Sequence, residues 1–306
     1  MHEGSKKAIF AAFLANLGIA IAKVVAAIIT GSASMLAEAI HSFADTGNQG
    51  LLFLGGRRAA KPADEHHQFG YGAERFFWAF VVALVLFTLG ALFSLYEGYD
   101  KLTNPHEVES PVVAFVVLGV AVLLEGLSLR TAVREANAHR NGRPWLAFIR
   151  LTKNPELPVV LLEDTGAIAG LVLALSGLAL AVATDEPRFD AVGSLAIGVL
   201  LAMIAIVLAV EMKSLLIGES AVSATEHQIH NTFATSPEVR SVIHMRTLQI
   251  GPEDVLLAAK LDFAVADVET LATAIDAVEA RIRDACGEVT VIYLEPDLDR
   301  SRTQPA

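Results

Sequence analysis

The amino-acid sequence predicts an α-helical membrane protein with six transmembrane helices, followed by a C-terminal α+β domain. Hydrophobic residues make up 54% of the 306-residue chain, and its mean hydropathy of +0.51 is too high for an ordinary soluble protein of this length. Apolar runs of about 20 residues, the length of a membrane-spanning helix, recur through the first two thirds of the chain. The remainder is acidic, because Glu219 to Ala306 contains 15 acidic and 7 basic residues.

Six apolar runs are long enough to cross the bilayer. Helices are the expected conformation, because a helix satisfies its own backbone hydrogen bonds in lipid. We expect the spans near Ala8–Ile29, Ala33–Leu54, Phe76–Tyr96, Val112–Val133, Leu157–Val182 and Ala191–Leu216. Together they define a transmembrane domain over residues 1–217.

The connections between these spans alternate in charge. One set is rich in lysine and arginine, whereas the other holds only Lys101 and Arg188 as bases beside acids such as Glu107, Glu109 and Asp185. Basic connections remain on the cytoplasmic side of a membrane. Both termini are therefore predicted to be cytoplasmic, in a multi-pass protein of the cell (inner) membrane. The basic set comprises Lys6, Lys7, Arg57, Arg58, Lys61, Arg75, Arg130, Arg134, Arg140, Arg143, Arg150, Lys153 and Lys213.

Residues 218–299 have the pattern of a compact cytoplasmic domain. The expected helices cover residues 223–237 and 267–286, and the expected strands cover residues 239–250, 255–265 and 288–296. Ser223 and Asp267 are candidate N-caps of the two helices, and "GPED" is the expected turn between the first two strands. The helix–strand–strand–helix–strand order predicts an α+β sandwich. Residues 300–306 are expected to form a disordered tail.

The composition argues against several classes of protein. The single cysteine, Cys286, rules out an internal disulfide framework and a zinc site built from several cysteines. The chain is not basic enough to indicate a nucleic-acid partner. An intramembrane metalloprotease would typically need an H-E-x-x-H helix, and that string does not occur. We therefore do not expect an enzyme.

The second span carries polar residues that lipid makes expensive. His41 and Asp45 are four residues apart, so they lie on one helix face about one turn apart. An imidazole and a carboxylate at this spacing can share one divalent cation. The alternative is a hydrogen bond between the two side chains that only stabilises helix packing.

The fifth span carries two acids, Glu163 and Asp164, with no basic neighbour in the segment. Two unpaired charges would cost about 3 kcal/mol each near the centre of the bilayer, and a divalent cation or a proton would remove that cost. The two side chains point about 100° apart on a helix. We favour Asp164 as a direct ligand, with Glu163 as a neighbour, a fourth ligand or a proton carrier. Asn48 would supply an oxygen or support a ligand, or else form a hydrogen bond between helices.

Other polar groups have less specific patterns. Glu38 and Glu125 are expected to pair with Lys23 or Arg130, or to extend towards the membrane surface. His66 and His67 could capture metal in a cytoplasmic connection, although a solvated loop is the simpler interpretation.

Four ordered motifs resemble those of the cation diffusion facilitator family of metal transporters, and in particular its mitochondrial-type zinc transporter branch. The motifs are "GSASMLAEAIHSFADTGNQ", "HQFGYGAERFFWAF", "LLEDTGAIAGL" and "FDAVGSLAIGVLLA". The resemblance covers nearly the whole chain and implies a ferredoxin-like cytoplasmic domain. It also implies a homodimer that exports a divalent metal from the cytoplasm in exchange for protons.

In this family the transport site uses two residues four apart on the second span and two more on the fifth. The first pair falls on His41 and Asp45, and the last position falls on Asp164. The remaining position falls on Val160, which cannot bind metal, so Glu163, Asn48 or water would complete the site. The resemblance favours Zn²⁺ as the transported substrate, although Mn²⁺, Fe²⁺ and Co²⁺ accept the same ligand types. No organic cofactor is implied.

Two other functions are compatible with these residues. A passive divalent-cation channel would need a continuous polar stripe, whereas only two spans carry strong acidic content near their middle. A non-transporting membrane metal sensor would report metal through the acidic domain, and only a flux measurement separates it from a transporter.

Overall fold

The computed structural model describes residues 3–108, 110–140, 142–265 and 267–300, with side chains from residue 16 onward apart from that of Phe87. The side chains of Lys6, Lys7 and Glu109 and most of the expected tail, residues 301–306, lie outside the described part. The chain divides into two compact units, Met1–Gly56 with Phe77–Met212, and Arg57–Phe76 with Lys213–Ala306. The domain boundary expected between residues 217 and 218 stays a prediction.

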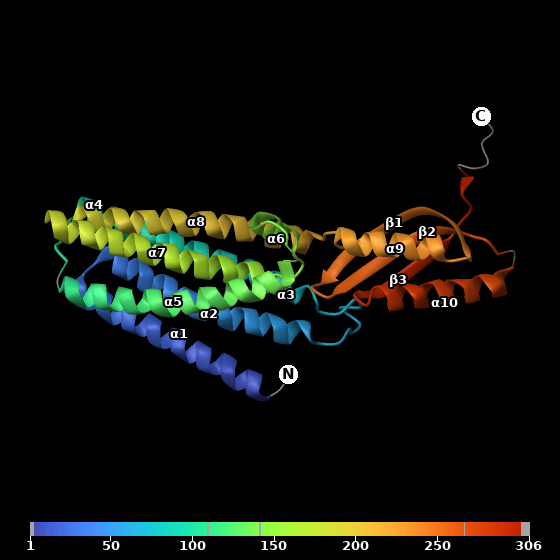
Figure 1. Ribbon diagram of the computed structural model, residues 1–306, viewed down its shortest axis with the longest axis horizontal. Helices are drawn as coiled ribbons and strands as arrows, with labels where there is room; N and C mark the ends of the chain where they lie inside the picture. The colour runs from blue at the N-terminus through green and yellow to red at the C-terminus, as the bar shows by residue number, and fades with distance from the viewer. Residues whose placement is uncertain (1–2, 109, 141, 266, 301–306) are drawn as a thin grey trace. The chain divides into compact units, whose positions relative to one another are not determined.

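The first unit is built from helices that follow one another along the chain (Figure 1). They are α1 (Glu3–Thr30), α2 (Ala33–Ala59), α3 (Glu74–Val85), the π-helix η1 (Leu86–Leu92), α4 (Phe93–Thr103), α5 (Pro111–Arg140), α6 (Trp145–Leu151), α7 (Glu156–Thr184) and α8 (Arg188–Ile217). Helices α5 and α7 pack against each other, and α1 packs against α5.

Four stretches of the described residues are long and apolar enough to cross a membrane. They are Glu74–Thr103, Pro111–Arg140, Glu156–Thr184 and Arg188–Ile217. Helix α1 contributes a shorter apolar stretch, Asn16–Thr30, and the apolar run of α2 is interrupted by Glu38, His41 and Asp45. The chain is thus a mostly helical membrane protein, and the number of six spans stays a prediction.

The third span differs from the expected uniform helix. Helix α3 continues without a break into η1 and α4, because both flanking residues, Val85 and Phe93, keep right-handed helical dihedrals. A π-helical segment has wider turns than an α-helix and often marks a functional position. The continuous helix reaches Thr103, beyond the expected end at Tyr96, so Lys101 belongs to the helix rather than to a connection.

Helix α6 was not expected from the sequence. It begins after Pro144, whose extended backbone precedes the first helical residue. Phe148 is buried and packs with Ala136 of α5 and Leu161 of α7. This short helix therefore packs against the C-terminal part of α5 and the N-terminal part of α7.

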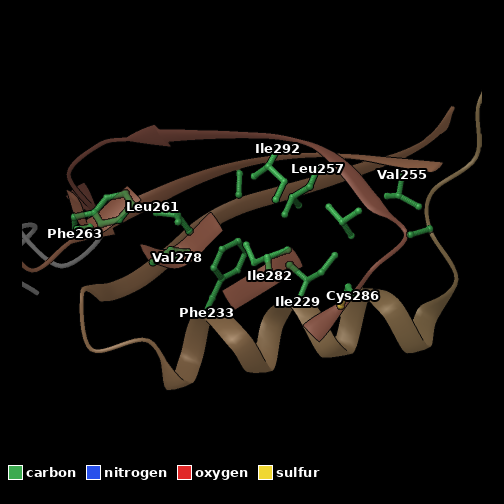
Figure 2. Packing of buried hydrophobic residues seen from close by; sticks show 14 residues of the cluster. Ile229, Phe233, Val255, Leu257, Leu261, Phe263, Val278, Ile282, Cys286 and Ile292 are labelled. Carbon is green, nitrogen blue, oxygen red and sulfur yellow. The ribbon is translucent and has the colours of Figure 1, made fainter. Parts of the chain in front are cut away.

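The second unit contains the expected α+β domain. Its elements are α9 (Ser223–Thr235), β1 (Val239–Gly251), β2 (Asp254–Phe263), α10 (Val268–Ala285) and β3 (Val289–Pro296). Strand β2 lies between an antiparallel β1 and a parallel β3. Figure 2 shows Phe233, Val278 and Ile282 facing the sheet residues Leu257 and Leu261, which form one buried core. The element order agrees with the sequence-based expectation.

One of the two expected helix caps is correct. Asp267 is the N-cap of α10, and its carboxylate accepts a 2.9 Å hydrogen bond from the backbone N–H of Thr270. Ser223 is not the cap of α9, because the helix begins one residue earlier than expected and Val222 occupies the N-cap position. The backbone carbonyl of Val222 already accepts from the N–H of Glu226.

The connection between α2 and α3 packs within the second unit. A Cβ atom on Gly72 would lie 2.8 Å from both Gly251 Cα and the Ile250 carbonyl oxygen, so only glycine permits this approach to the β1–β2 turn. In the same connection, Asp64 accepts hydrogen bonds from the backbone N–H groups of His66 and His67 and from the Tyr71 hydroxyl. The Tyr71 hydrogen bond and these backbone donors lower the pKa of Asp64.

Candidate metal centre

Four polar residues form a stripe along α2. Glu38, His41, Asp45 and Asn48 are spaced by three, four and three residues, so they share one face of the helix. The side chains of Glu38, His41 and Asn48 are fully buried, and that of Asp45 is 18% exposed. We call these four residues the α2 stripe.

The α2 stripe contains buried polar atoms that lack partners. His41 Nε2 lies 3.5 Å from Asp45 Oδ2, which is too long for a good hydrogen bond. Among the described residues, both ring nitrogens of His41, Asp45 Oδ1 and Asn48 Oδ1 have no hydrogen-bond partner. A buried polar atom without a partner costs about 1–3 kcal/mol. The packing interpretation of His41 and Asp45 requires a hydrogen bond that this geometry does not contain.

The two acids of α7 face different neighbours, as their helical spacing predicts. Glu163 is buried, and its Oε1 accepts a 2.6 Å hydrogen bond from Asn48 Nδ2 of α2. Asp164 instead accepts a 2.9 Å hydrogen bond from Ser128 Oγ of α5. The structure therefore turns Glu163, rather than Asp164, towards the α2 stripe.

Negative charge is concentrated where α2, α5 and α7 meet. The carboxyl groups of Glu163, Glu125 and Asp164 lie close enough to Asp45 to repel it when they are ionised. Imidazole and carboxylate groups are suitable ligands for Zn²⁺ and similar dications, and a bound dication would offset this repulsion. Within the described part of the chain, no group of three or more His, Cys, Asp and Glu side chains is close enough together to hold a metal ion.

A cavity of about 270 Å³ reaches Asp164 between α5 and α7. Its lining includes Ser128 and Glu135 from α5 and Glu156 and Val160 from α7. Val160, the position that carries a ligand in the family pattern, thus lies on the wall of the same cavity as Asp164.

Lys23 of α1 is a buried cation beside the α2 stripe. Its Nζ donates to Ser42 Oγ at 2.6 Å and to Glu38 Oε2 at 3.3 Å, and it lies 4.0 Å from Glu125 Oε1 of α5. Of the alternatives for Glu38 and Glu125, the structure shows pairing with Lys23. The sequence pattern gave no indication that one lysine serves both acids, because three helices contribute to the cluster.

A second buried polar cluster lies at the start of α2 and was not predicted. Asp190, in the first turn of α8, accepts from Ser32 Oγ and from the Ala33 backbone N–H at 2.7 Å, and also from Ser34 Oγ. Lys101 Nζ lies 3.4 Å from the same carboxylate. Asp190 thereby caps α2 from another helix. The only sequence signal was an acid at the start of an apolar run together with the Ser-x-Ser pattern before α2.

Residues 9–217 match the family model described as the cation efflux transmembrane domain. The chain belongs to the cation diffusion facilitator (cation efflux) family. This family is a non-enzymatic class of metal transporters, so the resemblance seen in the motifs and the expectation that the chain is not an enzyme are both confirmed.

Curated relatives of this cation diffusion facilitator include zinc transporters. The chain is 32% identical over 263 residues to a mitochondrial proton-coupled zinc antiporter of Homo sapiens, covering 85% of this chain and 46% of the relative. It is 31% identical to a metal tolerance protein of Arabidopsis thaliana, covering 75% of this chain and 50% of the relative. It is 24% identical to the zinc transporter ZitB of Pectobacterium atrosepticum, covering 83% and 75%. The chain spans about half the length of the first two relatives.

Proposed function

We propose that the protein is a secondary active transporter that exports Zn²⁺ from the cytoplasm in exchange for protons. The family supplies the class of metal transporter, and the names of two relatives specify zinc, one of them with proton coupling. Mn²⁺, Fe²⁺ and Co²⁺ accept the same ligand types and remain competing substrates in the proposal.

One observation carries this proposal. Unpartnered imidazole and carboxylate atoms of His41 and Asp45 are buried on one face of α2, and that face is linked to α7 through the Asn48–Glu163 hydrogen bond. Intramembrane ionisable residues generally mark ion pathways, because their burial is otherwise too costly. A dication bound by these donors would supply the partner that they lack.

The proposed ligands are His41, Asp45 and Asp164, with Glu163 as a neighbouring carboxylate that completes or supports the site. Asp164 faces α5 and Glu163 faces α2, so a rotation of α7 about its axis would change which carboxylate meets the metal, and a full exchange would need about 100°. Such a movement belongs to an alternating-access cycle, in which groups of helices rock around a fixed site. The cavity beside Asp164 supports metal entry between α5 and α7.

Proton exchange follows from the chemistry of the ligands. Metal binding requires deprotonated imidazole and carboxylate groups, so a bound metal and bound protons exclude each other. With the site open to the cytoplasm, Zn²⁺ displaces protons from His41 and the carboxylates. With the site open to the opposite side, protons compete for the same atoms and release the metal.

We further propose the arrangement of this transporter in the membrane. It would form six transmembrane helices with both termini cytoplasmic, and it would act as a homodimer through a ferredoxin-like cytoplasmic domain. The alternation of basic and acidic connections supports this orientation. The cell (inner) membrane is the proposed location, whereas the human relative is a mitochondrial protein.

Zinc uptake into inside-out vesicles with an imposed pH gradient tests the function. We expect saturable uptake that rises when the vesicle interior is acidic and falls when the gradient is collapsed. Uptake that does not saturate at low metal would indicate a channel, and zinc binding without uptake would indicate a sensor. Uptake indifferent to the pH gradient would contradict proton exchange.

A further inference from the structure

Glu38 holds a buried carboxylate oxygen that the metal site does not use. Its Oε2 receives the hydrogen bond from Lys23 Nζ, whereas its Oε1 has no hydrogen-bond partner among the described residues. The side chain is fully buried. Oε1 points to α7 at Gly170, where an added Cβ atom would lie within van der Waals overlap of the oxygen. Gly170 thus leaves room for this oxygen and offers it no polar group.

The charges around Glu38 do not balance when all of them are ionised. Lys23 from α1 and Glu125 from α5 are the charged groups that face Glu38, and α7 contributes the uncharged Gly170. His41 and Asp45 follow on the same face of α2. One ammonium and two carboxylates leave a net negative charge in a buried cluster, which burial strongly disfavours.

We propose that Lys23, Glu38 and Glu125 form a proton-binding site separate from the metal ligands, with Glu38 Oε1 as the atom that carries the proton. The proton then leaves Lys23 and Glu125 as a neutral pair. Glu38 is the better carrier of the two acids, because it is the more deeply buried: the side chain of Glu125 is 16% exposed and that of Glu38 is not exposed. A proton on Oε1 also displaces no existing hydrogen bond.

Metal binding would expel this proton. Glu38 precedes His41 by three residues on one helix face, so the two side chains are neighbours. A dication at His41 and Asp45 favours the ionised form of a nearby carboxyl group. The O–H bond of the Glu38 carboxyl breaks, the carboxylate keeps the electron pair, and the proton passes to water on the side to which the site is open.

This proposal rests on the proposed function and adds a proton that the metal ligands do not carry. The coupling is reciprocal, because a proton on Glu38 must weaken metal binding as much as metal weakens proton binding. Lys23 determines how many protons make the cluster neutral. With the ammonium present the cluster needs one proton, and without the ammonium it needs two.

The number of protons released per Zn²⁺ bound tests the site directly. We would titrate Zn²⁺ into the full-length protein in detergent, in weakly buffered solution containing a pH indicator, and obtain bound zinc from the same isotherm. Glu38→Gln keeps an oxygen that can accept from Lys23, and it should lower the proton release by about one while zinc still binds. Glu269→Gln, at an exposed position in the first turn of α10, should leave the count at the wild-type value. An unchanged count in Glu38→Gln overturns the proposal.

A second variant, Lys23→Met, should change the proton release in the opposite direction. Lys23→Met removes the ammonium, so both carboxyl groups should be protonated before zinc arrives and the proton release should rise above the wild-type count. A count that stays equal or falls overturns the proposal even if Glu38→Gln does not fold. The proton count requires only zinc binding, so it can be measured even in a protein that does not transport zinc. A failure of the proposed function would appear in the vesicle uptake assay instead.

Discussion

Asn48 of α2 donates a 2.6 Å hydrogen bond to Glu163 of α7, and both side chains are buried. This contact joins the helix that carries His41 and Asp45 to the helix that carries Asp164. It lies one helical turn from Asp45 on the α2 stripe. Both partners are buried, so breaking this hydrogen bond would leave polar atoms unpaired, and the bond therefore holds the two helices in a defined relative register.

Removal of this contact should impair transport. In Asn48→Ala the Glu163 carboxylate loses its donor and the α2–α7 register relaxes. Loss of a group that orients metal ligands typically costs roughly 10- to 100-fold in affinity or activity, and we expect initial zinc uptake to fall by that factor. Asn137→Ala, an exposed position on α5, is the matched control. Wild-type uptake in Asn48→Ala would mean that the hydrogen bond only packs the helices.

Asp45→Ala and Asp164→Ala should each abolish zinc uptake and leave the folded protein intact. Each substitution removes a proposed ligand, and each also removes a costly charge from the membrane. Thermal unfolding and gel filtration would establish that the variants fold. Asp276→Ala, at an exposed position of α10, should transport normally. The site assignment is wrong if both ligand variants retain wild-type uptake.

Gly177→Ala should destabilise the contact between α7 and α8. A Cβ atom there would lie 2.9 Å from the Phe189 carbonyl oxygen and 3.2 Å from Gly193 Cα. These are backbone atoms that cannot rotate away, so the helices must separate, at a cost of about 1–3 kcal/mol. Thermal unfolding in detergent measures the loss. Gly47→Ala has no neighbouring atom within 4 Å of its new Cβ and should unfold at the wild-type temperature.

The second unit should lose stability in acid through Glu238. Arg281 of α10 donates to both carboxylate oxygens of Glu238, at 2.6 and 2.8 Å. This pairing holds the pKa of Glu238 below its ordinary value of 4.5. Because the folded pKa is the lower one, the stabilisation is present above pH 4.5 and is lost as the pH falls through the folded pKa.

Hydrogen exchange of the α10 backbone amides in the full-length protein measures this effect. Glu238→Gln should exchange faster than wild type at neutral pH, and the difference should disappear in acid. Asp276→Asn, exposed on the same helix, serves as the control. An acid-independent difference would show that the carboxylate charge is not what matters.

Local patterns predicted the parts of the structure that depend on neighbouring residues. The spacing of His41 and Asp45 placed them on one face, and the carboxylate of Asp267 at the start of an apolar helix identified its cap. The relative directions of Glu163 and Asp164 also followed from helical geometry. Ser223 shows the limit of such patterns, because a shift of one residue in the helix start transferred the N-cap to Val222.

Contacts between distant segments were harder to predict from the sequence. Lys23 was recognised as a partner of Glu38 or Glu125, but its place between both acids depends on the packing of α1, α2 and α5. Asp190 was assigned to no role, since its donors at the start of α2 lie more than 150 residues away in the chain. Helix α6 is short, and its stability depends on Phe148 burying itself between two longer helices.

The π-helical turns of η1 determine which way the end of the third span faces. The length of η1, the seven residues Leu86–Leu92, fixes how α4 is rotated about the helix axis. Each residue added or removed there would turn α4 by about 100°. Lys101 would then swing away from Asp190, although neither residue had changed. The carboxylate that caps α2 would lose its counter-ion, and so the chain length of a distant segment governs the anchoring of the helix that bears the proposed metal ligands.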